Sequence, residues 1–438
     1  MMLPKLSVRV ASGKGAGICL TSVSHLGLDP RRLRGVTRGC NALLVLFAFL
    51  CVFGFASTGY AKFIEMVVNS DLLPSISESL DTYYADLVAF GYSPTVYAYD
   101  ASTGSSKDLR GHLRTRWESG SLDGTVFIGD LPVVTYEMRD GGYSSFPSDL
   151  YYMDLDGGWA DNDGNGRYDS HRGGLGDVAP EIWFGRITTS TLGDEVSLVN
   201  DYLRKNHEYR WGNLTFNEEA LVYIDDDWRP WADAWDSDVQ LTYPGATTLV
   251  KDKYTTNADD YKNRLATGNY ESILQTVHSS PRLLQFKSPD AYSHVFADEI
   301  PGLNPHIGYY NFFDCSFANY TANDYMAGKY IFETDYGLAG VGSTKSGSML
   351  KFDIFYDLLR DGAMGESLQG WFTTIGADGY QLWERQWFYG MTLLGDPTLG
   401  PATEPFLKSV PEPATILLLS TGLAGLIGYV RRRNWKRL

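Results

Sequence analysis

The stretch His306-Ile307-Gly308-Tyr309-Tyr310-Asn311-Phe312-Phe313-Asp314-Cys315 is an apolar run that ends on a thiol. A second run, Ser272-Ile273-Leu274-Gln275-Thr276-Val277, ends at His278. Both runs have the length and composition of buried strands, and open α/β sheets place their sites at the carboxyl ends of such strands. The two runs therefore predict a sheet that brings Cys315 and His278 to one edge.

Strand-like and helix-like segments alternate along the rest of the chain. Strands are predicted at 95–99, 124–130, 181–187, 220–224, 247–250 and 337–341, and helices at 64–90, 108–117, 193–210, 258–266, 323–334 and 349–360. Short apolar strands between helices indicate an α/β fold with a parallel or mixed sheet covered on both faces. We expect two adjacent subdomains, 62–190 and 191–400, followed by a linker at 401–413.

The thiol and the imidazole suggest a nucleophile and its base. A thiol is largely protonated at neutral pH, so a nucleophilic cysteine needs a neighbouring base or cation. Cys315 is the one cysteine left once the two terminal apolar segments are set aside, so it has no partner for an internal disulfide. A buried cysteine that packs as a small hydrophobe is the alternative.

Charge excludes one class of partner. The whole chain carries a formal charge of −16; because the first 61 residues contribute +6 and residues 411–438 contribute +4, the part between them carries −26. Nucleic acid is excluded as a partner, since phosphate binding needs a basic face. An acidic body suits solubility outside the cell and the binding of calcium.

Residues 1–61 have the features of a secretory signal peptide with an extended basic region. They carry seven Lys/Arg and one Asp, followed by the apolar stretch 42–55 and by small residues that allow cleavage after Ala61. That order of basic, apolar and small-residue segments is typical of export signals.

The C-terminal end resembles the PEP-CTERM sorting signal of Gram-negative bacteria. Val410-Pro411-Glu412-Pro413 precedes the uncharged segment 414–430, and Arg431-Arg432-Arg433 follows it. The resemblance implies an exosortase-type processing enzyme as partner. It also implies transient membrane anchoring by a helix within 414–438, and a final place in the cell envelope or extracellular matrix. An ordinary C-terminal anchor is the alternative.

An acidic, glycine-rich loop predicts a structural Ca²⁺ site. Oxygen-bearing residues alternate through it as in an EF-hand loop, but the twelfth position is Arg172 instead of glutamate. Oxygens from the residues just before the loop, or from Asp177 or Glu181, could complete the set. The predicted ligands are Asp154, Asp156, Asp161, Asp163, Asn165, Arg167 through its carbonyl, and Asp169. A solvated acidic loop is the alternative.

The middle of the chain resembles the gingipain family of cysteine peptidases. The matching pieces lie in the family's order over most of residues 120–400: Gly129-Asp130-Leu131-Pro132, the acidic loop, Pro180-Glu181-Ile182-Trp183-Phe184-Gly185-Arg186, the strands into His278 and Cys315, Gly342-Ser343-Thr344, and Leu394-Gly395-Asp396-Pro397-Thr398-Leu399.

The resemblance implies a caspase-like three-layer fold and endopeptidase activity on a protein or peptide substrate. Cys315 would be the nucleophile and His278 the general base and acid, and Glu181 matches a carboxylate that orients the histidine. For Glu181, a calcium ligand or a structural ion pair is equally compatible with the sequence.

One departure from the family keeps other functions open. Ser279 follows His278 where the family has glycine, at a position that helps form the oxyanion hole. A non-catalytic, calcium-binding surface or extracellular-matrix protein that retains the fold is therefore the alternative function. A metal-dependent hydrolase is disfavoured, because the acidic cluster lacks histidine.

Overall fold

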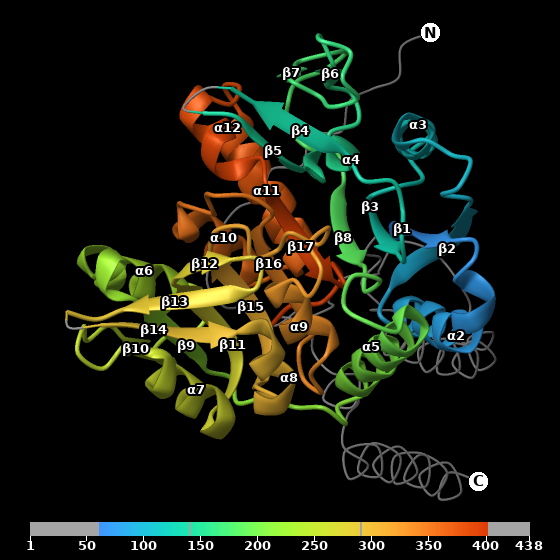
Figure 1. Cartoon of the computed structure of the whole chain (residues 1–438). Helices are drawn as coiled ribbons and strands as arrows, with labels where there is room; N and C mark the ends of the chain where they lie inside the picture. Colours follow the sequence, from blue (N-terminus) through green and yellow to red (C-terminus); the bar gives the residue numbers. More distant parts are fainter. Residues whose placement is uncertain (1–60, 140–141, 290, 402–438) are drawn as a thin grey trace, which may run out of the picture. The chain divides into compact units, whose positions relative to one another are not determined.

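The computed structural model describes residues 61–139, 142–289 and 291–401, which form a layered α/β body (Figure 1). Its centre is one ten-stranded sheet. In sheet order the strands are β10 (Thr247–Val250), β9 (Ala220–Ile224), β11 (Asn269–Thr276), β15 (His306–Phe313), β16 (Ala339–Ser343), β17 (Met391–Gly395), β8 (Trp183–Ile187), β3 (Gly124–Ile128), β1 (Lys62–Asn69) and β2 (Tyr92–Tyr99).

Strand direction changes once across this sheet. β15 pairs in parallel with β11 on one side and with β16 on the other. β17 is antiparallel to β16 but parallel to β8, and β8, β3, β1 and β2 are parallel to one another. The start of β8 therefore lies at the same sheet edge as the ends of β11 and β15.

Helices cover both faces of the sheet. Successive strand residues point to opposite faces, so Tyr309 joins one apolar core and Tyr310 the other. The core of Tyr310 is closed by α2 (Leu73–Ala89), α5 (Glu195–Arg210), α7 (Ala258–Thr267), α8 (Ile300–Leu303) and α9 (Met326–Phe332). The core of Tyr309 is closed by α3 (Ser106–Glu118), α4 (Leu150–Met153), α6 (Ala232–Val239), α10 (Phe352–Leu359), α11 (Met364–Gly376) and α12 (Leu382–Phe388).

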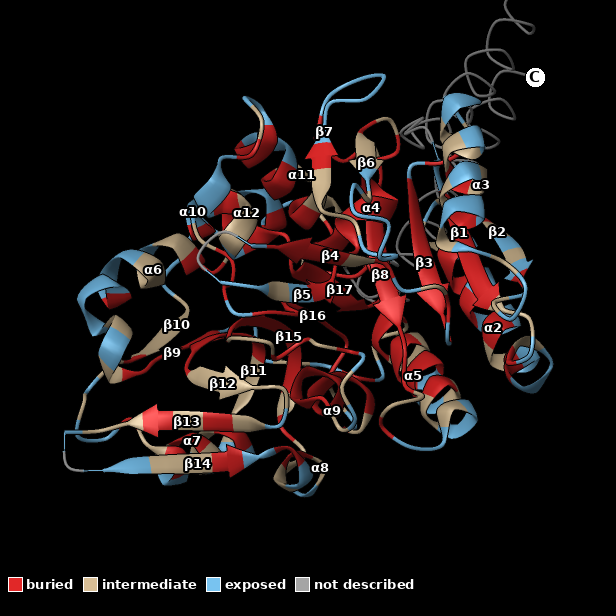
Figure 2. Ribbon diagram, turned by 45° about the horizontal axis from the view of Figure 1, so that its top comes forward, coloured by how far each residue is buried: buried red, intermediate tan, exposed pale blue. Residues whose placement is uncertain are grey.

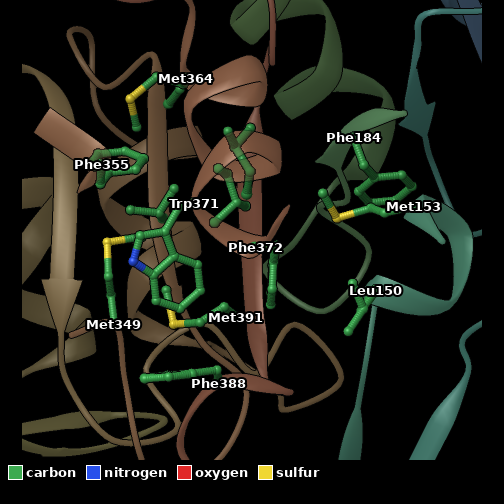
Figure 3. Close-up of a cluster of buried hydrophobic side chains, with 14 of the residues drawn as sticks. Leu150, Met153, Phe184, Met349, Phe355, Met364, Trp371, Phe372, Phe388 and Met391 are labelled. Atoms are coloured by element: carbon green, nitrogen blue, oxygen red, sulfur yellow. The ribbon is translucent and has the colours of Figure 1, made fainter. Parts of the chain in front are cut away.

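Burial follows these layers. The central strands are almost wholly buried, whereas the outer faces of the helices are exposed (Figure 2). In the core of Tyr309, the Trp371 ring of α11 lies among Met349, Phe388 and Met391 (Figure 3). Its indole N–H donates to the carbonyl of Leu350 at 2.8 Å, so α11 is fixed against the segment that follows β16. The predicted three-layer fold with a mixed sheet is confirmed.

Two buried ion pairs give a structural role to the sequence motifs at 180–186 and 394–399. Arg186 in β8 pairs with Asp149 at 2.5 Å, and Arg210 in α5 pairs with Asp396 at 2.6 Å, each pair being shielded from solvent. A side chain at Gly185 would place its Cβ 2.5 Å from the ring of Pro397, so only glycine allows β8 to approach this turn. These motif residues fix β8 to the segment before α4 and fix α5 to the turn after β17.

Smaller elements complete the chain. A three-stranded antiparallel sheet consists of β12 (His278–Ser280), β13 (Leu283–Lys287) and β14 (Tyr292–Phe296). Two hairpins pair β4 (Thr135–Met138) with β5 (Ser144–Pro147) and β6 (Gly158–Ala160) with β7 (Ser170–Arg172). The 3-10 turns are η2 (Asp226–Trp231) and η3 (Ala297–Glu299).

One predicted helix was wrong at its start. Residues 64–68 belong to β1, and the helix begins only at Leu73, beside Pro74 in its first turn. The apolar run Ile64-Glu65-Met66-Val67-Val68 favours a strand, because its β-branched residues fit a pleated sheet.

The terminal predictions fall almost entirely outside the described residues. The leader up to Tyr60 and the segment from 402 onward, with its anchor at 414–438, belong to that part of the chain. Among the residues that are described, no helix combines the length and apolarity needed to cross a bilayer.

Candidate active site

The pairing register brings His278 and Cys315 to matching positions. In the parallel pair of β11 and β15, Thr276 lies opposite Phe313. His278 and Cys315 each follow two residues later, on chains that leave adjacent strands about 4.8 Å apart. The Ser279 hydroxyl donates to the Cys315 carbonyl at 2.8 Å and ties the two segments together. Cys315 and His278 thus lie at the same edge of the sheet.

Asp227 from η2 holds the histidine. Its Oδ2 lies 2.8 Å from Nε2 of His278, and its other oxygen binds the ammonium of Lys287 in β13. The Lys287 hydrogen bond, followed by the one from His278, keeps the pKa of Asp227 below its ordinary value. An ionised carboxylate only accepts hydrogen bonds, so Nε2 donates, and Nδ1 of a neutral ring is left as the base. The Trp228 ring packs against the imidazole at 4.4 Å between centroids.

The loop that carries the thiol is fixed on both sides. Asp314 is buried and accepts hydrogen bonds from Gln275 at 2.5 Å and from the Val277 N–H at 3.2 Å. Ser316 adopts a left-handed conformation with φ of 57°. Its N–H donates to the Lys345 carbonyl at 2.7 Å, which attaches the loop to the segment after β16.

Cys315 is half-buried and forms no disulfide in the part of the chain that is described. Its backbone N–H has no hydrogen-bond partner among the described residues. It can therefore donate to an oxygen that develops negative charge beside the sulfur.

A cavity opens beside the histidine. Its volume is about 340 Å³, a size at the lower end of the range for ligand pockets. The lining residues come from η2 and from the β12–β13–β14 sheet: Asp227, His278, Ser279, Ser280, Leu283, Gln285 and Tyr292. The small sheet thus forms one wall of the candidate site.

Glu181, predicted to orient the histidine, makes its contacts elsewhere. Its carboxylate accepts hydrogen bonds from the backbone N–H groups of Leu155 at 2.5 Å and Asp156 at 3.3 Å. It precedes β8, and three strands separate β8 from β11, which corresponds to about 19 Å along the sheet. Burial raises the pKa of Glu181 to about 7. The carboxylate in contact with His278 is Asp227, which the sequence reasoning did not single out.

The predicted metal ligands fall into two groups with different partners. Oxygens of Asp154 and Asp156 gather with one of Glu181, and oxygens of Asp163 and Asp169 gather with one of Glu137, in each case within 4.8 Å of one another. Glu137 lies on β4, and the loop pattern contained no signal for it.

The remaining predicted ligands serve the fold of the loop. Asp161 accepts from the N–H groups of Gly164 at 2.8 Å, Asn165 at 3.1 Å and Gly166 at 2.8 Å. The Asn165 side chain accepts from the Arg167 N–H at 2.9 Å, and the Arg167 guanidinium lies 3.8 Å from Glu137.

Comparison with known proteins gives a family and a sorting motif. The sequence model of peptidase family C25 matches residues 45–402, and that of the PEP-CTERM protein-sorting motif matches residues 409–433. No curated protein matches the chain. Among solved structures, a transcription regulator like protein from Staphylococcus haemolyticus has 9% identity over 77% of this chain and 98% of that chain, with a TM-score of 0.16. A TM-score that low carries no argument about fold or function.

Proposed function

Because the chain belongs to peptidase family C25, whose members are cysteine peptidases, we propose that it is an endopeptidase in which Cys315 attacks the substrate and His278 transfers the proton. The observation that supports this proposal is the register of β11 and β15, because the two chains that continue to His278 and Cys315 leave these adjacent strands at matching positions. Membership in the family implies protein substrates, and the sorting motif indicates export and processing by exosortase.

The proposed mechanism follows the roles of these groups. Nδ1 of His278 accepts the thiol proton, and the sulfur of Cys315 attacks the carbonyl carbon of the scissile peptide. The Cys315 N–H donates to the oxyanion that forms. The imidazolium then protonates the leaving amine, and a thioester remains. His278 next deprotonates a water molecule, which attacks the thioester, releases the carboxylic acid and restores the thiol.

Asp227 is the orienting residue in this proposal. It holds Nε2–H at 2.8 Å, which keeps Nδ1 free of a proton in the resting ring and stabilises the imidazolium once it forms. The hydrogen bond from Lys287 lowers the pKa of Asp227 and so favours its ionised form.

Structural calcium is the second part of the proposal. In each acidic group one buried oxygen has no hydrogen-bond partner: Oδ1 of Asp156 and Oε1 of Glu137. Such oxygens fit a hard cation, which prefers oxygen ligands and would relieve the repulsion between carboxylates. When bound, Ca²⁺ would neutralise these charges and order the loop. The groups that would hold it are Asp154, Asp156 and Glu181, and Glu137, Asp163 and Asp169.

The location of the mature protein is part of the same proposal. The basic cluster after 414–430 would hold the end of that segment on the cytoplasmic side until exosortase processes the protein in a Gram-negative bacterium. The catalytic body would then act on proteins of the cell envelope or extracellular matrix.

A peptide-library digestion tests the activity. The purified protein should cleave internal peptide bonds, and Cys315→Ala should abolish all cleavage while its melting temperature stays within a few degrees of wild type. Cleavage that persists in Cys315→Ala would exclude this nucleophile. A folded wild-type protein that cleaves no peptide and forms no adduct with peptidyl electrophiles would favour the non-catalytic matrix protein instead.

A further inference from the structure

The small sheet of β12, β13 and β14 has one buried face and one open face. Along β13, Leu284 and Phe286 belong to the apolar core and are fully buried, whereas the other three residues of the strand are half-buried. β14 repeats this alternation around the buried Val295, with Tyr292 58% exposed and Phe296 52% exposed. Because successive side chains of a strand point to opposite faces, one face of the sheet packs on the core and the other faces solvent.

The proposed base lies on the open face. His278 pairs with Gln285, and Gln285 pairs with His294, so these three residues form one row across the sheet. The pair of Ser280 and Leu283 lies in the next row. Side chains that are directly opposite in an antiparallel pair share a face, with their Cβ atoms about 5 Å apart. The imidazole is therefore at one end of a continuous surface.

The cavity beside the imidazole lies on this surface. Leu283, Gln285 and Tyr292 of the open face line it, and Asp227 from η2 forms a further wall. Its volume of about 340 Å³ suits a single substrate side chain better than a larger ligand. Leu283 and the Tyr292 ring offer apolar surface, whereas Asp227 brings a carboxylate that already pairs with His278 and Lys287.

The proposed chemistry decides which part of a substrate lies here. The acyl segment of the substrate is bound to the sulfur of Cys315, and the imidazolium of His278 protonates the leaving amine. The segment released with that amine therefore begins at the imidazole. β12 contacts the Cys315 loop through the Ser279 hydroxyl and pairs with β13, so it joins that loop to the open face.

We propose that the open face of this sheet binds the part of the substrate that follows the scissile bond, and that Leu283 and Tyr292 select an apolar side chain there. Burial of apolar surface favours such a side chain, and the Asp227 carboxylate repels an acidic one. The inference rests on the proposed function, because it uses His278 as the group that protonates the leaving amine. It makes Leu283 and Tyr292 specificity-determining residues.

The test uses peptides that differ only in the residue directly after the scissile bond, together with the methyl ester of the same acyl segment. The ester has no leaving side chain, so the ratio of the two kcat/KM values isolates the leaving segment. In the wild-type protein this ratio should be at least about tenfold higher for leucine or phenylalanine than for serine, and lowest for aspartate. Tyr292→Ala should lower the ratio for the apolar peptides by about tenfold, and Tyr292→Phe, which keeps the ring, should preserve it.

The matched control is Tyr84→Ala. Tyr84 is another exposed aromatic residue, 39% exposed on α2, and its removal should leave the ratio unchanged. Leu283→Ser gives the same readout as Tyr292→Ala if the latter does not fold.

The outcomes separate this inference from the proposed function. Equal ratios in wild type, Tyr292→Ala and Leu283→Ser would overturn it while the peptidase proposal stands. So would a preference for apolar residues that appears only before the scissile bond. An equal fall in ester and peptide hydrolysis would show that Tyr292 merely supports the imidazole, which also overturns the inference. A wild-type protein that hydrolyses neither ester nor peptide would overturn both proposals.

Discussion

At the scale of single residues, the site depends on which carboxylate holds His278. Asp227 is in hydrogen-bond contact with the imidazole, whereas Glu181 binds backbone N–H groups of the acidic loop. A carboxylate that fixes the tautomer of a catalytic histidine contributes about 10⁴ to kcat in serine peptidases. Within the described part of the chain, Asp227 is the carboxylate in hydrogen-bond contact with His278, so we expect this role of Asp227.

Asp227→Asn should therefore lower kcat by about 10²- to 10⁴-fold. The amide can donate to Nε2, which would leave the proton on Nδ1 and remove the base. The matched control is Asp226→Asn, because Asp226 belongs to the same turn but pairs with Arg229 at 3.7 Å. The kcat of both variants is measured by steady-state hydrolysis of a peptide substrate that the wild-type protein cleaves well. If Glu181→Gln lost the activity and Asp227→Asn kept it, the assignment taken from family resemblance would be correct.

At the scale of elements, α5 links both halves of the sheet through buried polar contacts. Its Arg210 binds Asp396 after β17, and its Lys205 donates to the carbonyls of Ile331 at 2.8 Å and Thr334 at 2.7 Å at the end of α9. Both side chains are almost inaccessible to solvent. Substitutions here should change stability while the chemistry of the site stays intact.

Asp396→Asn should lower the free energy of unfolding by about 3–5 kcal/mol, because it leaves the buried charge of Arg210 uncompensated. Urea unfolding at neutral pH measures the change. Glu208→Gln on the same helix is the control: it breaks the exposed pair with Arg204, and pairs of that kind contribute little. Equal and small effects of both substitutions would show that Arg210 finds another partner.

Lys205 makes stability depend on pH. Burial lowers its pKa to about 7 in the folded protein, whereas an unfolded chain has a lysine pKa of about 10.4. Between these two pKa values, Lys205 is protonated in the unfolded chain and largely neutral in the folded protein. Because the unfolded state binds more protons than the folded state, the free energy of unfolding rises as pH increases from 7 toward 10. Lys205→Met should flatten that rise in urea unfolding. An unchanged slope would mean that Lys205 is not the group responsible.

The elements also show what could be predicted from sequence. The strands into His278 and Cys315 were predicted because each is an apolar run that ends on a polar residue, and their shared edge followed from the rules of parallel sheets. The contact of Asp227 with His278 could not be predicted, since 51 residues separate the two and the η2 turn has no periodic signal. The apolar pattern of β1 continues into that of α2, so the sequence alone predicts one helix across both elements. The β12–β14 sheet, half-exposed and short, lacked an apolar run.

At the scale of the whole molecule, the acidic loop is packed against the rest of the body through buried hydrogen bonds, so its order should affect the stability of the whole protein. Asp154 is fully buried and binds His171, which in turn contacts the Tyr389 hydroxyl at 2.7 Å. Through His171, the loop is therefore in contact with Tyr389, which lies between α12 and β17. Disorder in the loop should spread to the turn that carries Tyr389.

Removal of divalent cations should lower the melting temperature by several degrees, and added Ca²⁺ but not Mg²⁺ should restore it. Calorimetry with and without a chelator measures the shift. Glu137→Gln combined with Asp156→Asn should reduce the response to the chelator, because the two substitutions remove the negative charge of the carboxylates whose buried oxygens have no hydrogen-bond partner. Identical melting curves in chelator and in calcium would contradict a structural metal.

The most direct test of the account is covalent trapping at Cys315. A peptidyl electrophile that resembles a substrate should label this sulfur in the wild-type protein, and His278→Ala should slow labelling by at least about a hundredfold while the variant remains folded. Equal labelling rates in wild type and His278→Ala, or an adduct on any residue other than Cys315, would contradict the central claim that these two groups act together at the edge of the sheet.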